Sequence, residues 1–527
     1  MHKNWALAGV VLVGTAVSDA AMAAPHGARL TYSDDPTTTI AISWTSTSAT
    51  DVEVIFGTTP SDLSSSIAAQ QTFAQPDPLS NSFTAKLSGL TPNTTYYYRV
   101  GSAGNYHPPG GSDPFQFTTL GGDPCQPFSF VLIGDNRADT DNVGPSPKWP
   151  KILAETQAYA PQFYVNTGDM VKNGERAVEW ANFVDDSEAG WGFVPSILTI
   201  GNHDDMDDNG PGALYSQLFE LPHNSQNDWE NYYSIDVGPI HFVSLDSNLS
   251  GTEFTEMLAW LDADLAATDK PWRAVFFHHA IYSRGNHYTG EEDDGTLNAN
   301  LIPIFDAHDV DFVFNGHSHN YERYAPTTGV DPEFGGSGRA YPAGNGAANA
   351  PGATVPDGAT GTTYMVSGGA GALTTEIGGF ECIDAGCTKC GLPEFLWECE
   401  PAVLDRDKDG MAIYDGKHNF AVFSVNGPRI DVEVWTTEEG NTGSPEKIDT
   451  FTVMSSDLGE GCGVDAPDAG APGTGGSDGG GAGDDGPGAG KDSGGCGCRA
   501  ASRGGASSLI LVVLALAMAV RRNRISG

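Results

Sequence analysis

The chain has 527 residues, of which 68 are acidic and 26 are basic, and its formal net charge is −42 at pH 7. A surface with this excess of negative charge repels nucleic acids and anionic membranes, so neither is an expected partner. The length indicates more than one domain and enough apolar residues for a large core.

Residues 1–23 are predicted to be a secretory signal peptide. Lys3 supplies positive charge, the run from Trp5 to Val17 is apolar, and Ala21-Met22-Ala23 matches an A-x-A cleavage site. A membrane anchor is the alternative, but this apolar run is too short to span a bilayer. The protein is therefore expected to be exported.

Residues 24–120 are predicted to form an all-β sandwich. Apolar and polar residues alternate with a period of two in 39–44 and in 52–56, as in half-buried strands. The segment 87–100, with three consecutive tyrosines, resembles the fibronectin type III signature and its corner tyrosine. The resemblance implies a scaffold domain, with an adhesive or carbohydrate-binding role as the alternative.

Five short polar blocks follow, each directly after an apolar run that is predicted to be a strand. The apolar runs are 130–133, 163–165, 197–200, 274–277 and 312–314. The blocks are Gly134-Asp135-Asn136-Arg137, Gly168-Asp169, Gly201-Asn202-His203-Asp204, His278-His279 and Gly316-His317-Ser318-His319. Loops at the carboxyl ends of strands build the ligand sites of open α/β sheets. Carboxylates, an amide and imidazoles suit Zn, Fe or Mn, so the blocks predict a metal site.

Each block alone has an ordinary structural explanation. A lone Gly-Asp is usually a turn, and a lone histidine after a strand is usually a half-buried side chain with satisfied hydrogen bonds. The occurrence of all five blocks in order favours the metal site. Between them, 254–265 is predicted to be an amphipathic helix with Leu258, Leu261 and Leu265 on its buried face.

Together the blocks resemble the calcineurin-like metallophosphoesterase superfamily. The run 316–323 resembles the last motif of its purple acid phosphatase branch, whose larger members carry a sandwich domain before the catalytic one. The resemblance implies that residues 125–456 form a four-layer α/β/β/α sandwich, preceded by the fibronectin-like domain. Residues 420–425 and 430–435 are predicted to form a closing hairpin.

The resemblance also implies two metal ions, drawn from Fe, Zn and Mn, that share the bridging carboxylate of Asp169. The other ligands would be Asp135 and His319 at the first site and Asn202, His278 and His317 at the second. His279 competes with His278, but the family pattern favours the first histidine. His203 is the expected general acid, oriented by Asp204.

Two positions depart from the family pattern. Arg137 stands where wider phosphoesterases have the histidine of Asp-x-His, and Lys172 stands where purple acid phosphatases have a tyrosine. The first site is therefore expected to retain metal weakly and to lack the purple colour of an iron tyrosinate. Arg137 is expected to bind the substrate phosphate or to form a surface salt bridge. By resemblance, His287 is expected to contact the substrate.

A Cys-rich insertion is predicted at 376–418. Its cysteines, Cys382, Cys387, Cys390 and Cys399, favour two disulfides over a zinc site. Within it, Asp405, Asp407 and Asp409 have the spacing of a calcium loop, but Gly416 stands where such a loop needs Glu. A Ca²⁺ site and a plain acidic turn both stay open. Cys125 and Cys462 are hypothesised to join the two ends of the catalytic domain.

The end of the chain is predicted to lie outside any folded domain. Residues 457–495 are rich in Gly and Asp and read as a disordered linker. Residues 496–527 combine Cys496-Gly497-Cys498, an apolar run and an arginine cluster, and resemble the C-terminal sorting signals of myxobacteria. The resemblance implies retention at the outer membrane and cell surface, with an ordinary tail anchor as the alternative.

The sequence as a whole predicts a secreted binuclear metallophosphoesterase. Its expected partner is a small phosphomonoester, which metal-bound hydroxide would attack at phosphorus. A phosphodiesterase or nucleotidase on the same site is the first alternative. A surface-binding protein with a degenerate site is the second, because the first metal site lacks two usual ligands.

Overall fold

A computed structural model gives the structure of the chain. It describes residues 25–74, 81–138, 146–206, 212–223, 230–283, 287, 296–324, 326–329, 354–355, 361–372, 374, 411–437 and 445–455. The predicted signal peptide, the cysteine cluster, the acidic residues Asp405, Asp407 and Asp409, the predicted linker and the predicted sorting tail lie outside these residues. Among the described residues, no helix is both long and apolar enough to cross a membrane.

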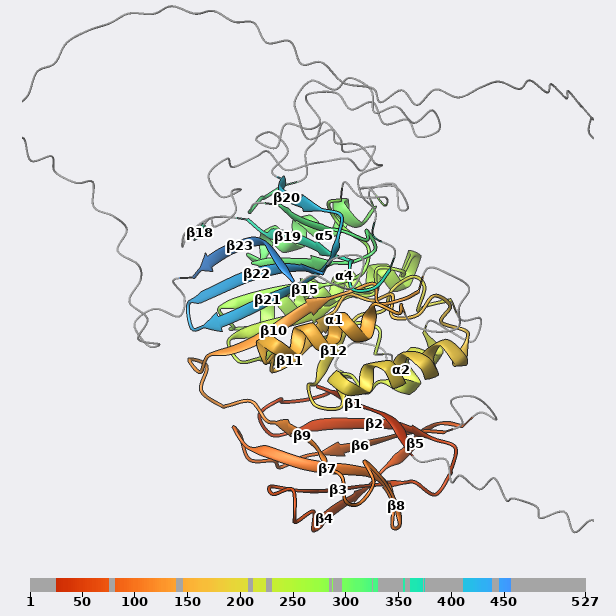
Figure 1. The fold of residues 1–527 in the computed structure, drawn as a ribbon. Coiled ribbons are helices and arrows are strands. Elements are labelled where there is room, and N and C mark those ends of the chain that lie inside the picture. The colour runs from red at the N-terminus through yellow and green to blue at the C-terminus, as the bar shows by residue number, and fades with distance from the viewer. Residues whose placement is uncertain are drawn as a thin grey trace, which may run out of the picture. The chain divides into compact units, whose positions relative to one another are not determined.

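The N-terminal region forms two antiparallel sheets, as the alternating sequence pattern predicted (Figure 1). One sheet contains β1 (His26–Thr31), β2 (Ile40–Ser46), β5 (Gln70–Ala74) and β6 (Asn81–Leu87). The other contains β3 (Glu53–Gly57), β4 (Ser65–Ala68), β7 (Thr95–Ser102), β8 (Asn105–His107) and β9 (Phe115–Thr118). The hydroxyl of Tyr96 accepts the backbone N–H of Thr91 at 2.9 Å, the contact expected of a corner tyrosine.

The predicted catalytic region, residues 125–456, contains two further sets of strands. The first set is β10 (Phe128–Ile133), β11 (Phe163–Asn166), β12 (Ser196–Leu198), β18 (Thr354–Val355), β21 (His418–Asn426), β22 (Arg429–Thr437) and β23 (Glu446–Met454). The second set is β13 (Tyr233–Val237), β14 (Ile240–Ser244), β15 (Trp272–Phe276), β16 (Phe312–Asn315), β17 (Tyr321–Tyr324), β19 (Thr363–Ser367) and β20 (Met411–Asp415).

Both sheets are mixed. In the first, β10, β11 and β12 are parallel, and β10 pairs antiparallel with β21 of the predicted closing hairpin. In the second, β14, β15, β16 and β19 are parallel. The first sheet continues beyond β12, because β12 pairs in parallel with β1 of the N-terminal region. Within the described residues it therefore runs as one eleven-stranded sheet.

Helices cover the outer faces of the two sheets. They are α1 (Trp149–Thr156), the short 3-10 helix η1 (Gln157–Tyr159), α2 (Ala177–Trp191), α3 (Ala213–Leu218), α4 (Gly251–Ala267) and α5 (Thr296–Ala307). Helices α4 and α5 share an apolar cluster with β14, β15, β16 and β19. Helices α1 and α2 pack in the cluster that contains β10, β11 and β12 (Figure 1). This confirms the predicted α/β/β/α layering and the preceding all-β domain.

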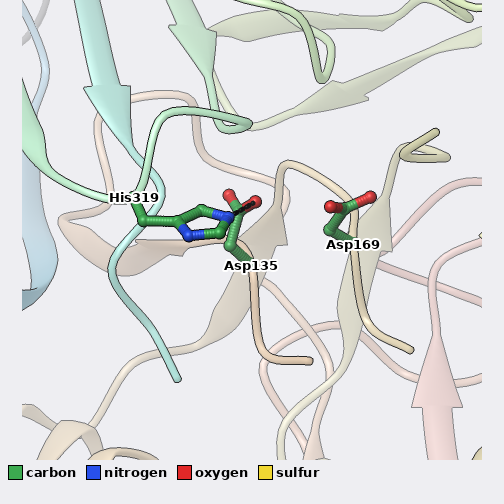
Figure 2. Close-up of side chains that lie close together, drawn as sticks. All are labelled: Asp135, Asp169 and His319. Carbon is green, nitrogen blue, oxygen red and sulfur yellow. Dashed lines mark ion pairs between the residues drawn. The ribbon is translucent and has the colours of Figure 1, made fainter. Parts of the chain in front are cut away.

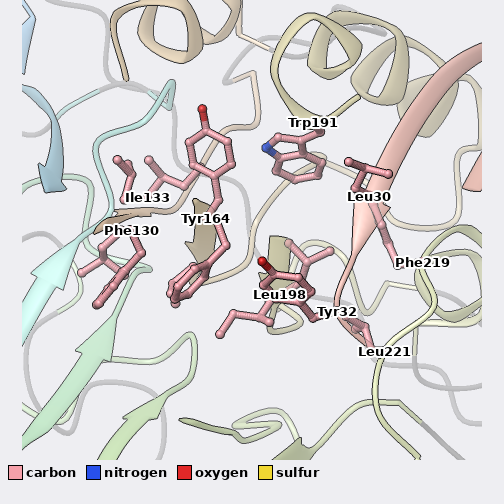
Figure 3. Close-up of a cluster of buried hydrophobic side chains, with 14 of the residues drawn as sticks. Leu30, Tyr32, Phe130, Ile133, Tyr164, Trp191, Leu198, Phe219 and Leu221 are labelled. Carbon is pink, nitrogen blue, oxygen red and sulfur yellow. The ribbon is translucent and has the colours of Figure 1, made fainter. Parts of the chain in front are cut away.

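The core between the sheets is rich in aromatic rings. Phe130 of β10 stacks on Phe423 of β21 with 4.5 Å between ring centroids, and it meets Phe242 of β14 edge-on at 5.5 Å. Figure 3 shows part of the same cluster, in which Leu30 of β1 and Tyr32, the residue after β1, lie with Tyr164 and Leu198. Apolar residues on both faces of β10 and β11 account for the continuous hydrophobic runs seen in the sequence.

Three predictions need correction or comment. Residues 411–415, at the end of the segment predicted as an insertion (376–418), form β20 and pair with β17. Leu258 is only partly buried, whereas Leu261 and Leu265 of the same helix are buried as predicted. Cys125 is disulfide-bonded, but Cys462 lies outside the described residues, so their pairing stays a prediction.

Candidate metal centre

Loops from both sheets bring acidic and imidazole groups to one place. Asp135 and Asp169 follow β10 and β11 of the larger sheet, and His319 follows β16 of the smaller one. A carboxylate oxygen of each aspartate and a ring nitrogen of His319 all lie within 4.8 Å of one another. Figure 2 shows these three side chains, with His319 next to Asp135. All three are buried, so this first group concentrates negative charge away from water.

A second group lies beside Asp169. His278 Nε2 is 3.3 Å from Asp169 Oδ1 and 3.2 Å from His317 Nδ1. His278 Nδ1 lies 2.8 Å from the carbonyl of Thr167 and donates to it, because a carbonyl only accepts. The other ring nitrogen, Nε2, therefore faces the site. Asn202 Oδ1 is buried and accepts no hydrogen bond from the described residues, as expected of a metal ligand.

The backbone at the candidate ligands is unusual. Asp135, Asp169 and His317 have φ angles of 58°, 55° and 68°, in the left-handed region that residues with a side chain rarely adopt. The contacts around them hold this conformation; for example, Asp135 Oδ2 accepts the backbone N–H of His317 at 3.0 Å. Backbone strain of this kind clusters at functional sites.

His203 is oriented by a backbone carbonyl. Its Nδ1 lies 2.7 Å from the carbonyl oxygen of Lys172 and donates to it, while its backbone N–H donates to Asp169 Oδ1 at 3.0 Å. The sequence predicted that Asp204 orients His203, but the contacts of His203 are with Lys172 and Asp169. The Asp204 carboxylate instead accepts backbone N–H groups, those of Met170, Val171 and Gly201. It therefore ties together the loops that carry Asp169 and Asn202.

Burial and neighbouring charges shift the pKa values of Asp169, His203 and Asp204. Burial alone would raise the pKa of the Asp169 carboxyl, but His278, His203 and Arg137 hold that pKa well below its usual value. Burial lowers the pKa of His203 against the opposing effect of Asp169. Burial and the nearby Asp169 charge raise the pKa of Asp204 to about 7, despite its bonds to backbone N–H groups.

Arg137 lies within the first group. Its Nε donates to Asp169 Oδ2 at 3.0 Å, and its Nη2 is 3.2 Å from His319 Nε2. Arg137 and Asp169 form an ion pair, but the residue is 8% exposed, so the pair is buried and does not lie at the surface as the alternative predicted. The expected contact with a substrate phosphate stays a prediction. The oxygen and nitrogen atoms of the second group suit the coordination of a divalent metal. In the first group, the Arg137 guanidinium already contacts two of the atoms that would coordinate a metal, Asp169 Oδ2 and His319 Nε2.

The two remaining candidate histidines lie next to His317. The rings of His287 and His317 are 4.0 Å apart between centroids, which places His287 beside the site as the resemblance implied. His279 turns toward Ser247, with its Nδ1 2.8 Å from the hydroxyl oxygen. His278, and not His279, therefore faces Asp169, as the family pattern favoured.

The strand after the last histidine block is held by a residue that the sequence did not reveal. Tyr321 and Arg323 of β17 both donate to Asp449 Oδ2, at 2.8 and 2.7 Å. Glu322, also buried, accepts from the hydroxyl groups of Ser283 and Tyr324. Through these contacts, residues 321–323 support the histidine loop. Asp449 carries no motif of its own, so only the fold identifies it.

Comparison with known proteins gives two family matches. Residues 25–119 match the family described as purple acid phosphatase, N-terminal domain, and residues 128–321 match the family described as calcineurin-like phosphoesterase. An uncharacterized protein of Mycobacterium tuberculosis is 26% identical over 339 residues, which cover 58% of this chain and 63% of that protein. Purple acid phosphatase 21 of Arabidopsis thaliana is 29% identical over 250 residues, covering 46% and 53%.

A solved structure supports the fold. The purple acid phosphatase PPD1 from yellow lupin (Lupinus luteus) seeds superposes with a TM-score of 0.61 at 18% sequence identity, covering 83% of this chain and 76% of that one. The fold agrees with the match of residues 128–321 to the calcineurin-like phosphoesterase family. This chain carries the purple acid phosphatase N-terminal domain followed by a calcineurin-like phosphoesterase domain. It matches less than two thirds of the length of the Mycobacterium tuberculosis and Arabidopsis thaliana relatives.

Proposed function

We propose that the protein is a metal-dependent phosphatase that hydrolyses phosphomonoesters. The observation that carries this proposal is the position of Asp169, which belongs to the first group and also lies 3.3 Å from His278 of the second. A carboxylate shared by two ligand groups suits a pair of cations that act together on one phosphoryl group. The family match of residues 128–321 supports the same chemistry.

The ligand residues divide between two positions. Asp135, Asp169 and His319 would hold one metal, and Asp169, Asn202, His278 and His317 would hold the other. The donors are oxygen and nitrogen, which suits Fe, Zn or Mn. When bound, the metal pair supplies Lewis acidity toward the phosphoryl oxygens and makes water a stronger acid.

The protein residues around the metals position the substrate and move a proton. The bond from His203 Nδ1 to the Lys172 carbonyl fixes the imidazole and leaves Nε2 for the leaving oxygen. A positioned histidine of this kind is a suitable general acid. His287, whose ring centroid lies 4.0 Å from that of His317, would contact the phosphate. The buried backbone around Asp204 keeps the two ligand loops in register.

We also propose that the protein lies outside the cell, because of the predicted features of its two ends. Residues 1–23 carry the features of an export signal, and 496–527 those of a sorting tail. Deleting the residues after Gly495 should therefore release active enzyme into the medium, as measured by fractionation of cells that express either form. Equal retention of both forms on the cells would show that another segment anchors the protein.

A substrate panel tests the reaction. Aryl phosphomonoesters, aryl phosphodiesters and nucleotides are offered to pure protein whose metal content has been measured by elemental analysis. We expect turnover of the monoesters, and its loss in Asp169→Ala together with the metal. Preferential turnover of the diesters would assign a phosphodiesterase to the same site. Metal-loaded protein that hydrolyses none of them would contradict the proposal and favour a binding role.

A further inference from the structure

Arg137 contacts two of the three residues that would hold the first metal. Its Nε donates to Asp169 Oδ2 at 3.0 Å, and its Nη2 lies 3.2 Å from His319 Nε2. A guanidinium offers only donors, so Asp169 and His319 must both accept through a lone pair. His319 Nε2 also lies 3.5 Å from Asp135 Oδ1, an oxygen that accepts no hydrogen bond from the described residues. The positively charged guanidinium of Arg137 is therefore part of the folded site.

A metal ion at the first position would have to bind the same lone pairs of Asp169 and His319 that accept hydrogen bonds from Arg137. An imidazole nitrogen has one lone pair in the ring plane, so His319 Nε2 binds either the guanidinium or a metal, and not both at once. A metal beside Asp169 Oδ2 would also lie close to the positive charge of Arg137, and the repulsion is strong in a buried site. The first position thus accepts one cation at a time.

The contacts at the second metal position differ from those at the first. The neighbours of His278 Nε2 are Asp169 Oδ1 at 3.3 Å and His317 Nδ1 at 3.2 Å, which are groups that a metal would gather as ligands. Asn202 contributes a buried oxygen, which accepts no hydrogen bond from the described part of the chain. Nothing in these contacts requires a cationic side chain to leave before a metal binds.

We propose that Arg137 is a built-in competitor for the first metal. The guanidinium occupies the position between Asp169 and His319, and a metal enters only when the side chain turns away. The folded protein therefore binds one metal firmly, at the second position, and another weakly. This inference rests on the metal centre of the proposed function, but it does not depend on which substrate is hydrolysed.

Metal titration tests the competition directly. Protein freed of metal by a chelator is titrated with Mn²⁺ alone, followed by calorimetry and by electron paramagnetic resonance, which separates an isolated Mn²⁺ from a coupled pair. The wild type should bind one ion tightly and show the isolated signal. Arg137→Met removes both hydrogen bonds and the charge, and it should bind the second ion roughly tenfold to hundredfold more tightly and show the coupled signal.

Arg429→Met is the matched control. Arg429 pairs with Asp431 on β22 through bonds of 2.7 Å, and both side chains are more than one third exposed. This variant should titrate like the wild type. If Arg137→Met does not fold, Arg137→Lys replaces it, because a single ammonium cannot reproduce the planar pair of bonds and should give an intermediate affinity.

Two results would overturn the inference: equal and tight binding of two ions by the wild type, or unchanged second-ion affinity in the folded Arg137 variants. Hydrolysis of phosphoesters is measured separately on the same samples. An inactive protein that still shows the Arg137 effect would refute the proposed function and leave the competition standing.

Discussion

Gly201 makes room for the carboxylate that both ligand groups share. A Cβ at this position would lie 2.2 Å from Asp169 Oδ1 and 2.3 Å from the backbone nitrogen of the same residue. The backbone nitrogen cannot move aside as a flexible side chain can. We therefore expect Gly201→Ala to displace Asp169, so that metal content and turnover fall together. Elemental analysis and steady-state kinetics measure both quantities.

Gly122→Ala is the control for that change. No heavy atom lies within 4 Å of a Cβ at Gly122, apart from its chain neighbours, so the added methyl group meets open space. This variant should keep the metal content and turnover of the wild type. A Gly201→Ala protein with full metal content would show that the Asp169 loop is not held as tightly as the structure indicates.

His203 should affect turnover without affecting metal retention. Its Nδ1 is committed to the Lys172 carbonyl, and its Nε2 is assigned to the leaving oxygen. We expect His203→Ala to keep its metal and to lose about 10²–10⁴ in turnover, the usual contribution of a positioned acid. The loss should shrink for aryl phosphates, because good leaving groups need less protonation.

Asp169→Ala provides the comparison for His203→Ala. Asp169 belongs to both ligand groups, so its removal should strip metal and abolish turnover at once. Suppose instead that His203→Ala loses metal as severely as Asp169→Ala. His203 would then be a ligand, and the general acid would have to be sought at His279 or His287.

The residue types of the site could be predicted from the sequence, but several of their partners could not. Imidazoles and carboxylates recur directly after successive apolar runs, so Asp135 and His319 stand out in the sequence. The partners of His203 and His278 are the backbone carbonyls of Lys172 and Thr167. Every residue offers a carbonyl, so residue identity gives no signal for such a contact.

Among the elements, β14 is joined to two neighbours through one buried imidazole. His241 Nδ1 lies 2.8 Å from Asp236 Oδ1 on β13, and its Nε2 lies 2.9 Å from Asp264 Oδ2 on α4. Lys270 Nζ faces the other oxygen of Asp236 at 3.7 Å. Burial lowers the pKa of His241, but the two carboxylates outweigh it and raise this pKa from 6.5 to about 9.

This shift predicts a pH-dependent stability. A pKa that is higher in the folded state stabilises the fold fully below 6.5, and the stabilisation is lost as the pH rises through 9. The difference in unfolding free energy between wild type and His241→Gln should fall by on the order of 3 kcal/mol across this window. Urea unfolding at both ends of the window measures it.

The glutamine variant separates this effect from the rest of the protein. Gln does not titrate, so its own pH dependence reports all other groups, including Asp236, Asp264 and Lys270. A difference between wild type and variant that stays constant from below pH 6.5 to pH 9 would contradict the raised pKa of His241.

The elements were predictable where a single sequence feature defines them. Apolar runs before polar blocks identified β10, β11, β12, β15 and β16, and the segment from 420 to 435 identified the hairpin of β21 and β22. The pairing of β20 with β17 and the contact of β17 with Asp449 join segments about 90 to 130 residues apart in the chain. Such contacts depend on the tertiary fold, which local periodicity does not encode.

On the scale of the whole molecule, the N-terminal sandwich and the catalytic region share contacts typical of a single folding unit. Tyr98 of β7 donates its hydroxyl to the carbonyl of Gly192 at 2.7 Å, and the backbone N–H of Ala28 donates to Glu188 of α2 at 2.9 Å. Arg29, buried on β1, donates to the carbonyl of Leu218 on α3 at 2.8 Å.

These contacts predict that both regions unfold together. Calorimetry of the full chain should show one transition for them. Tyr98→Phe leaves the Gly192 carbonyl without its donor, so it should lower the midpoint of that one transition by the equivalent of about 1–3 kcal/mol. Two transitions, with only one of them moved by Tyr98→Phe, would show that the regions unfold independently.

The strand β12 has only three residues, and its outer side is taken by β1, with the backbone N–H of Tyr32 donating to the carbonyl of Ser196 at 3.3 Å. Without β1, the unpaired backbone groups of β12 would form an open sheet edge, which is a template for pairing with another chain. A catalytic region cut free at residue 120 would therefore tend to associate with copies of itself. By covering this edge, the N-terminal sandwich would prevent β12 from pairing with other chains and so would reduce aggregation.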